Sequence, residues 1–234
     1  MRSRFASAVL FRVLLLSILG AASTMVAFAD SFTINTGPPN TSIAIWGYPN
    51  TATYGQTITP VGTTTQLNSF TFYINPQSTP ITYRAYVMAW NGTQATGPVL
   101  FESGDQVVPA ASGMNPYTYN TGGVNLTAGS QYVLFISVSN NYVPGNGLAV
   151  VGARSDAPYG GGQFVYINNG GNFGMWTSTP WSSFGAGWDL AFTAELSSPP
   201  TETPEPASML LLVTGFTGVA VRLRKRQRTR KSET

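Results

Sequence analysis

From residue 30 to residue 200, the chain alternates short aromatic or β-branched runs with turns rich in Gly, Pro and Asn. Two such runs, Leu67–Ile74 and Ile81–Trp90, are followed by Asn75-Pro76 and Asn91-Gly92. Aromatic and β-branched residues favour strands, whereas Gly, Pro and Asn favour turns. Because no helical period of useful length occurs in this region, the sequence predicts an all-β domain.

Two further runs indicate how the strands are arranged. Gln131–Val138 is almost continuously apolar, which is typical of a central strand buried on both faces. Trp188–Leu196 alternates apolar and polar residues and is predicted to be the last strand, pairing back with an early one. About ten strands within residues 30–196 predict a two-sheet antiparallel sandwich, jelly-roll-like in its connections.

The distribution of charge excludes several functions. Between Asp30 and Pro204 the basic residues are Arg84 and Arg154, against seven acidic residues, so the net charge of this body is −5. Because an acidic body has no basic surface to attract the phosphates of a nucleic acid, we expect no nucleic-acid partner. The chain has no Cys and no His, which excludes thiol catalysis, Ser-His-Asp triads and zinc sites built from these residues.

The N-terminus has the layout of a secretory signal peptide. Three arginines accompany an apolar run at residues 13–20, and the small residues Ala27 and Ala29 precede Asp30. Small residues at the −3 and −1 positions mark a cleavage site, so residues 1–29 are predicted to be removed. The alternative is an uncleaved anchor helix.

The C-terminus has four consecutive parts. Residues 197–203 form a Pro/Ser/Thr stalk, Pro204-Glu205-Pro206 follows, residues 207–221 carry no charge, and residues 222–231 are rich in Arg and Lys. A helix over 207–221 would be about 22 Å long, short of a hydrocarbon core of about 30 Å but extendable by snorkelling arginines. The positive-inside rule then keeps the basic tail in the cytoplasm and places the body outside.

Pro204, Glu205, Pro206, the short apolar helix and the Arg-rich tail together resemble the PEP-CTERM sorting signal of Gram-negative bacteria. The resemblance implies a precursor held transiently in the inner membrane, recognition by an exosortase-type processing enzyme, and export to the cell surface or extracellular matrix, often in bacteria that make exopolysaccharide. Thr203 stands where Val is common, and Thr214 and Thr217 lie within the helix. The alternative is an ordinary tail anchor with a chance Pro-Glu-Pro.

The body is similar to a domain type often found ahead of this signal, on residues 83–103, 176–181 and 189–192, and this resemblance implies a fold rather than an activity.

Two pairs of carboxylates are candidates for catalysis, because two acids suffice for glycoside hydrolysis. Glu102 and Asp105 flank a turn, whereas Asp189 and Glu195 lie about 20 Å apart along one strand. Neither pattern brings two acids together across a cleft, so we predict no catalytic residues and no enzyme.

No cofactor and no metal-binding residues are assigned. Jelly-roll modules often hold one structural Ca²⁺, to which Asp105, Asp156 or Asp189 would contribute. Because no D-x-D-x-D loop is present, this Ca²⁺ stays an open alternative.

Aromatic residues near Gly, Pro or Asn are the most suggestive binding feature of the body. Trp176 and Trp181 lie in a Gly-rich segment with few bulky neighbours in the sequence, and exposed rings stack on sugars. The alternative is that each ring is buried and fills the core at the end of the sandwich. The sequence therefore favours an exported, non-enzymatic structural or interaction protein, with an exopolysaccharide-retaining carbohydrate-binding module as the alternative and a glycan-active enzyme as the second.

Overall fold

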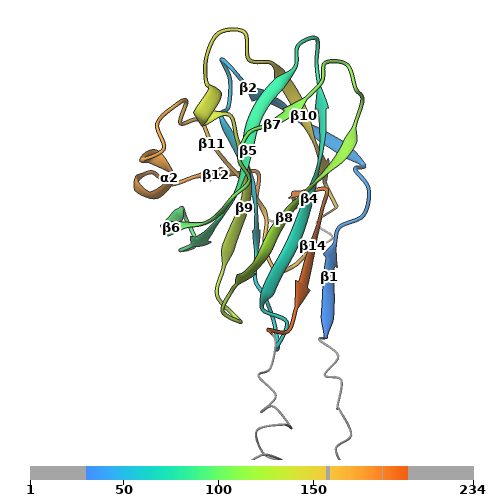
Figure 1. Cartoon of the computed structure of the whole chain (residues 1–234), viewed down its shortest axis with the longest axis vertical. Coiled ribbons are helices and arrows are strands. Elements are labelled where there is room, and N and C mark those ends of the chain that lie inside the picture. The colour runs from blue at the N-terminus through green and yellow to red at the C-terminus, as the bar shows by residue number, and fades with distance from the viewer. Residues whose placement is uncertain (1–29, 157–158, 186, 200–234) are drawn as a thin grey trace, which may run out of the picture. The chain divides into compact units, whose positions relative to one another are not determined.

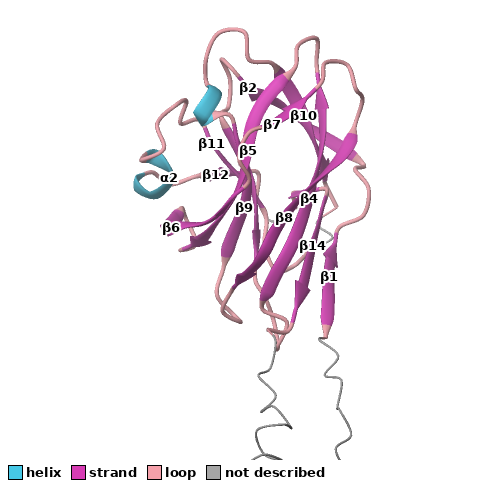
Figure 2. Cartoon of the chain, viewed as in Figure 1, coloured by secondary structure: helices cyan, strands magenta, loops and turns pink. Residues whose placement is uncertain are grey.

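The structure is a computed structural model that describes residues 30–156, 159–185 and 187–199. These residues belong to one compact unit, Ala29–Pro199. Its strands form two seven-stranded antiparallel sheets that face one another (Figure 1). Among the described residues, helix is confined to two short elements, η1 (Ser139–Asn141) and α2 (Met175–Ser178) (Figure 2). The predicted all-β antiparallel sandwich is confirmed.

The first sheet is made of β1 (Ser31–Asn35), β2 (Thr41–Gly47), β4 (Gln66–Pro76), β8 (Asn115–Asn125), β10 (Leu148–Arg154), β13 (Asp189–Leu190) and β14 (Phe192–Ser197). The second sheet is made of β3 (Thr53–Ile58), β5 (Ile81–Trp90), β6 (Ala95–Glu102), β7 (Gln106–Val108), β9 (Tyr132–Ser137), β11 (Phe164–Ile167) and β12 (Ser182–Ser183). The described residues thus form fourteen strands where about ten were expected, because strands as short as β12 and β13 have no detectable period in a sequence.

Both specific strand predictions are confirmed. All six residues of β9 are buried, and the strand lies between β3 and β5. The last strand, β14, pairs with β1 on one side and with β4 on the other. The continuously apolar run therefore forms a strand that is buried on both faces, and the alternating run forms a strand with one buried face.

Two hydrophobic clusters hold the unit together. The larger cluster fills the space between the sheets and includes the fully buried rings of Trp46, Phe70 and Phe72. A smaller cluster lies on the outer face of the second sheet. The alternation of β9 shows the division, because Leu134 belongs to the larger cluster and Phe135 to the smaller one.

In the part of the chain that the structure describes, no helix has the length and apolar character needed to cross a membrane. The predicted signal helix (residues 1–29) and the predicted sorting signal (residues 204–231), including its membrane helix, lie outside the described residues.

Candidate functional site

The two tryptophans predicted to be exposed are buried, and this prediction is wrong. Trp176 is 4% exposed and Trp181 is 8% exposed. Trp176, on α2, meets the rings of Tyr86 and Phe135 edge-on, each at a centroid distance of 4.9 Å. Trp181 packs against Trp90 at 5.4 Å. The bulky neighbours come from β5 and β9, which are distant in the sequence, and neither indole offers a free face to a sugar.

Hydrogen bonds fix both indoles in this outer cluster. Trp176 Nε1 donates to Thr53 Oγ1 (3.3 Å), and Trp181 Nε1 donates to the carbonyl oxygen of Trp176 (3.0 Å). The Thr53 hydroxyl also lies 2.7 Å from Ser137 Oγ and 2.8 Å from Asn169 Oδ1. Because buried polar atoms need partners, this network positions the segment that carries the tryptophans. Both residues therefore have a structural role.

Three exposed carboxylates, Glu102, Asp105 and Asp156, contact arginines. Arg84 contacts Glu102 and Asp105, each at 2.6 Å, and it holds the pKa of Asp105 below its ordinary value through a hydrogen bond. Arg154 contacts Asp156 at 2.6 Å and likewise lowers its pKa. The structure thus brings Glu102 and Asp105 together, but around a shared cation at the surface. This arrangement differs from an acid–base pair that flanks a substrate.

Asp189 has a different environment. It is 1% exposed, and its carboxylate accepts hydrogen bonds from Gln56 Nε2 (2.7 Å) and from the Tyr159 main-chain N–H (3.2 Å). Burial raises the pKa of Asp189. Within residues 30–156, 159–185 and 187–199, no three acidic side chains converge in a way that would hold a metal ion. The Ca²⁺ alternative on Asp105, Asp156 or Asp189 stays a prediction.

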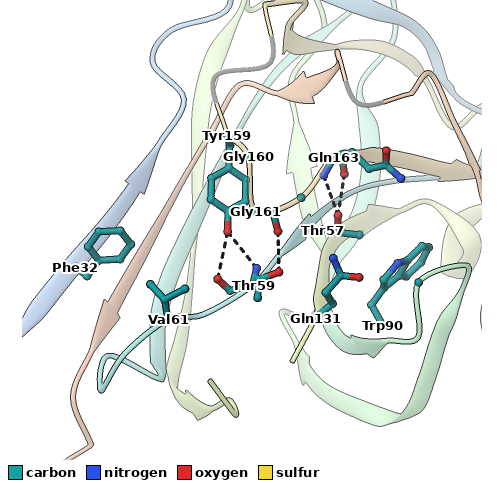
Figure 3. A pocket seen from close by; sticks show the side chains of 12 residues that line it. Phe32, Thr57, Thr59, Val61, Trp90, Gln131, Tyr159, Gly160, Gly161 and Gln163 are labelled. Atoms are coloured by element: carbon teal, nitrogen blue, oxygen red, sulfur yellow. Dashed lines mark hydrogen bonds between the residues drawn. The ribbon is translucent and has the colours of Figure 1, made fainter. Parts of the chain in front are cut away.

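A groove that the sequence did not predict lies beside β3, where the segment from Tyr159 to Gln163 crosses the end of that strand (Figure 3). It measures about 690 Å³ and is open to solvent. Twelve described residues line it, namely Phe32, Thr57, Thr59, Val61, Trp90, Gly92, Gln131, Tyr159, Gly160, Gly161, Gly162 and Gln163. None of these side chains is charged at neutral pH.

The floor of the groove is held by hydrogen bonds that Figure 3 shows. Thr59 N–H donates to the Tyr159 hydroxyl (3.1 Å), and Thr59 Oγ1 donates to the carbonyl oxygen of Gly161 (2.8 Å). Thr57 Oγ1 accepts from the main-chain N–H of Gln163 (2.9 Å). A Cβ at Gly162 would overlap the carbonyl oxygen of Thr57. Gly162 thus allows a close approach of two backbones.

Polar side chains border this floor. The main chain of Gln163 bonds to Thr57, and the main-chain carbonyl of Gln131 accepts from Trp90 N–H (2.9 Å). The side-chain amides of both glutamines make no hydrogen bond to another described residue, so they are available to a ligand. Trp90 itself is 8% exposed, so little of its ring is open to a ligand. The groove thus offers amides and hydroxyls to a ligand, and none of its twelve lining side chains is charged at neutral pH.

Comparisons with known proteins identify the C-terminal segment. The PEP-CTERM protein-sorting motif family matches residues 202–225. No curated protein matches the chain.

Two solved structures resemble the body distantly. One contains the cysteine protease and lectin-like domains of Cwp84, a surface layer associated protein of Clostridium difficile, with 11% identity and a TM-score of 0.44 over 64% of this chain and 32% of that chain. The other is the clostridial cysteine protease Cwp84 after propeptide cleavage, with 12% identity and a TM-score of 0.49 over 73% of this chain and 41% of that chain. The chain spans less than half the length of either, and likenesses at these scores carry no inference about activity or binding.

The fold and the matched motif define the class, which is a β-sandwich protein with a C-terminal sorting signal. Within that class, the chain carries the PEP-CTERM protein-sorting motif at residues 202–225.

Proposed function

We propose that the chain is a non-enzymatic protein of the cell surface or extracellular matrix, sorted and processed through its C-terminal signal. The observation that carries the proposal is the motif match over residues 202–225, which includes Pro204, Glu205 and Pro206. An exosortase-type enzyme acts at or near this triplet while the precursor is held in the inner membrane. Because proline is incompatible with a helix interior and restricts the residue before it, the sequence predicts a non-helical triplet that an enzyme cleft can grip.

The contacts of the carboxylates support a non-enzymatic body. Glu102 and Asp105 share Arg84, Asp156 pairs with Arg154, and Glu195 accepts a hydrogen bond from Thr33 Oγ1 at 2.7 Å. A general acid or base must reach a substrate proton, whereas these groups are committed to neighbours at the surface. The body therefore acts through its surfaces.

Replacing Glu205 with Ala tests the processing step. We expect full-length precursor to accumulate in the membrane fraction, because the Pro-Glu-Pro triplet loses its charged side chain. Intact mass spectrometry of the membrane and extracellular fractions of the native host measures this directly. Glu202→Ala, which removes a carboxylate from the same matched segment but outside the triplet, should mature like the wild type. Normal maturation of the Glu205→Ala protein would contradict the proposed role of the triplet.

A further inference from the structure

We propose that the groove beside β3 binds a short stretch of an uncharged polysaccharide. The inference rests on the proposed function in one respect, since export places the groove where extracellular polymers are found. Three properties of the groove carry it, which are the charge of its lining, its hydrogen-bonding groups and the packing of its floor.

The charge of the lining selects against ionic ligands. None of the twelve lining residues carries a charged side chain. The two arginines of the described residues, Arg84 and Arg154, are paired with carboxylates elsewhere on the surface. A phosphate or uronate entering the groove would lose water without gaining a cation. The groove therefore fits a ligand that carries no charge.

The lining also provides what a sugar ring requires. Each of the Gln131 and Gln163 amides presents two donor hydrogens and one acceptor oxygen, which suit the neighbouring hydroxyls of a sugar. Phe32 is 45% exposed and Val61 is 58% exposed at one end of the groove (Figure 3). Such apolar surfaces suit the C–H face of a sugar ring. At about 690 Å³, the groove lies within the usual range of about 300–1,000 Å³ for ligand sites.

The floor is arranged before any ligand arrives. The Tyr159 hydroxyl accepts from the main-chain N–H of Thr59 and donates to its carbonyl oxygen, and the Thr59 hydroxyl donates to the carbonyl oxygen of Gly161. A ligand thus meets a surface whose backbone is already packed, which lowers the entropy lost on binding. An open groove with few contacts binds one segment weakly, so retention on a polymer depends on many repeated units.

Two glycines provide a matched pair of variants. Gly160 lines the groove, and a Cβ there meets no described atom within 4 Å. Gly187 has the same freedom but does not line the groove. Gly160→Leu therefore obstructs the groove without straining the backbone, and Gly187→Leu controls for an added surface leucine. Gln131→Ala, which removes an exposed amide, is a second and milder variant.

Affinity electrophoresis of the full-length chain tests the inference. The protein is kept in a polyoxyethylene detergent, which contains no sugar, and run through gels containing dextran, mannan, hydroxyethyl cellulose or the anionic polymer alginate. We expect retardation by at least one of the three neutral polymers and none by alginate. Gly160→Leu should weaken the retardation at least about five-fold and Gln131→Ala at least about two-fold. Gly187→Leu should behave as the wild type.

Three results would overturn the inference. They are no retardation by any of the neutral polymers, stronger retardation by alginate, and equal retardation of the wild type and a folded Gly160→Leu variant. Thermal unfolding checks the fold of each variant, and Gln131→Ala decides the outcome if Gly160→Leu unfolds. Failure here leaves the processing proposal intact, because the Glu205→Ala experiment measures maturation and not binding.

Discussion

At the scale of single residues, Asp189 is a carboxylic acid whose ionisation the fold opposes. The other carboxylates with shifted pKa values, Asp105 and Asp156, face arginines that lower those values. Asp189 is buried, receives hydrogen bonds only from the neutral groups Gln56 and Tyr159, and lies near enough to Asp156 to be disfavoured further. Burial is the main cause of its raised pKa.

Replacing Asp189 with Asn should change the pH dependence of stability. Between about pH 4 and the raised pKa of Asp189, the native wild type binds more protons than the unfolded chain, so its stability falls as pH rises. Asp189→Asn lacks this titration. Its free energy of unfolding, relative to the wild type, should therefore increase from pH 4 to pH 7 in urea titrations.

Asp156→Asn is the matched control, because Arg154 lowers the pKa of Asp156. The native wild type then binds fewer protons at this site than the unfolded chain does, and the stability from the site is lost as pH falls. Asp156→Asn should therefore lose stability relative to the wild type as pH rises. Parallel pH profiles of the wild type and Asp189→Asn would show that Asp189 ionises at its ordinary pKa.

At the scale of elements, the segment around α2 is a cover for the second sheet. Strand β5 alternates Tyr83 and Ala85 toward the larger cluster with Tyr86 and Met88 toward the smaller one, so both of its faces are apolar. A sheet with two apolar faces needs a layer on each side. The sequence contained this signal in the apolar run of β9, but it did not show which segment forms the outer layer. The sequence alone therefore predicts that Trp176 and Trp181, in the Gly-rich segment, are exposed.

Trp176→Ala should destabilise the body by about 3–5 kcal/mol, as large aromatic truncations in cores do. The indole is 4% exposed, packs on Tyr86 and Phe135, and donates to Thr53. Urea unfolding followed by circular dichroism measures the loss. Phe173→Ala, in the same segment but with 41% exposure, should cost less than half as much. Equal costs would mean that the cover does not depend on the buried indole.

At the scale of the whole molecule, local patterns predicted the fold but not the groove. The sandwich, the buried β9 and the terminal position of β14 each follow from periodicity within one run of residues. The groove depends on Thr57, Gln131 and Tyr159 meeting from three distant segments. No period or spacing in the sequence encodes that meeting, and Gly162 marks only the close approach of two backbones beside Thr57.

The same topology brings the two ends of the folded unit together. Strand β1 pairs with β14 along its whole length, and Ser198 N–H donates to the carbonyl oxygen of Asp30 at 2.8 Å. Figure 1 shows that both ends of the described chain leave the sandwich at one end. The predicted cleavage position before Asp30 and the start of the matched sorting motif are thus joined to the same end of the body. The pairing of β1 with β14 therefore holds the first and last strands of the unit together.

A disulfide across this pairing tests the arrangement, and the chain has no cysteine of its own to interfere. Ser31 lies opposite Ser197 in the antiparallel register, and directly opposed residues there have Cα atoms about 4.5–5.5 Å apart, within the range of a disulfide. The Ser31→Cys, Ser197→Cys protein should oxidise quantitatively and gain about 2–4 kcal/mol, because the bond closes a loop spanning nearly the whole body. Non-reducing electrophoresis and unfolding with and without dithiothreitol measure both effects, with Ser31→Cys alone as the control. Free thiols in the oxidised double variant would contradict the register, and with it the pairing of the first strand with the last.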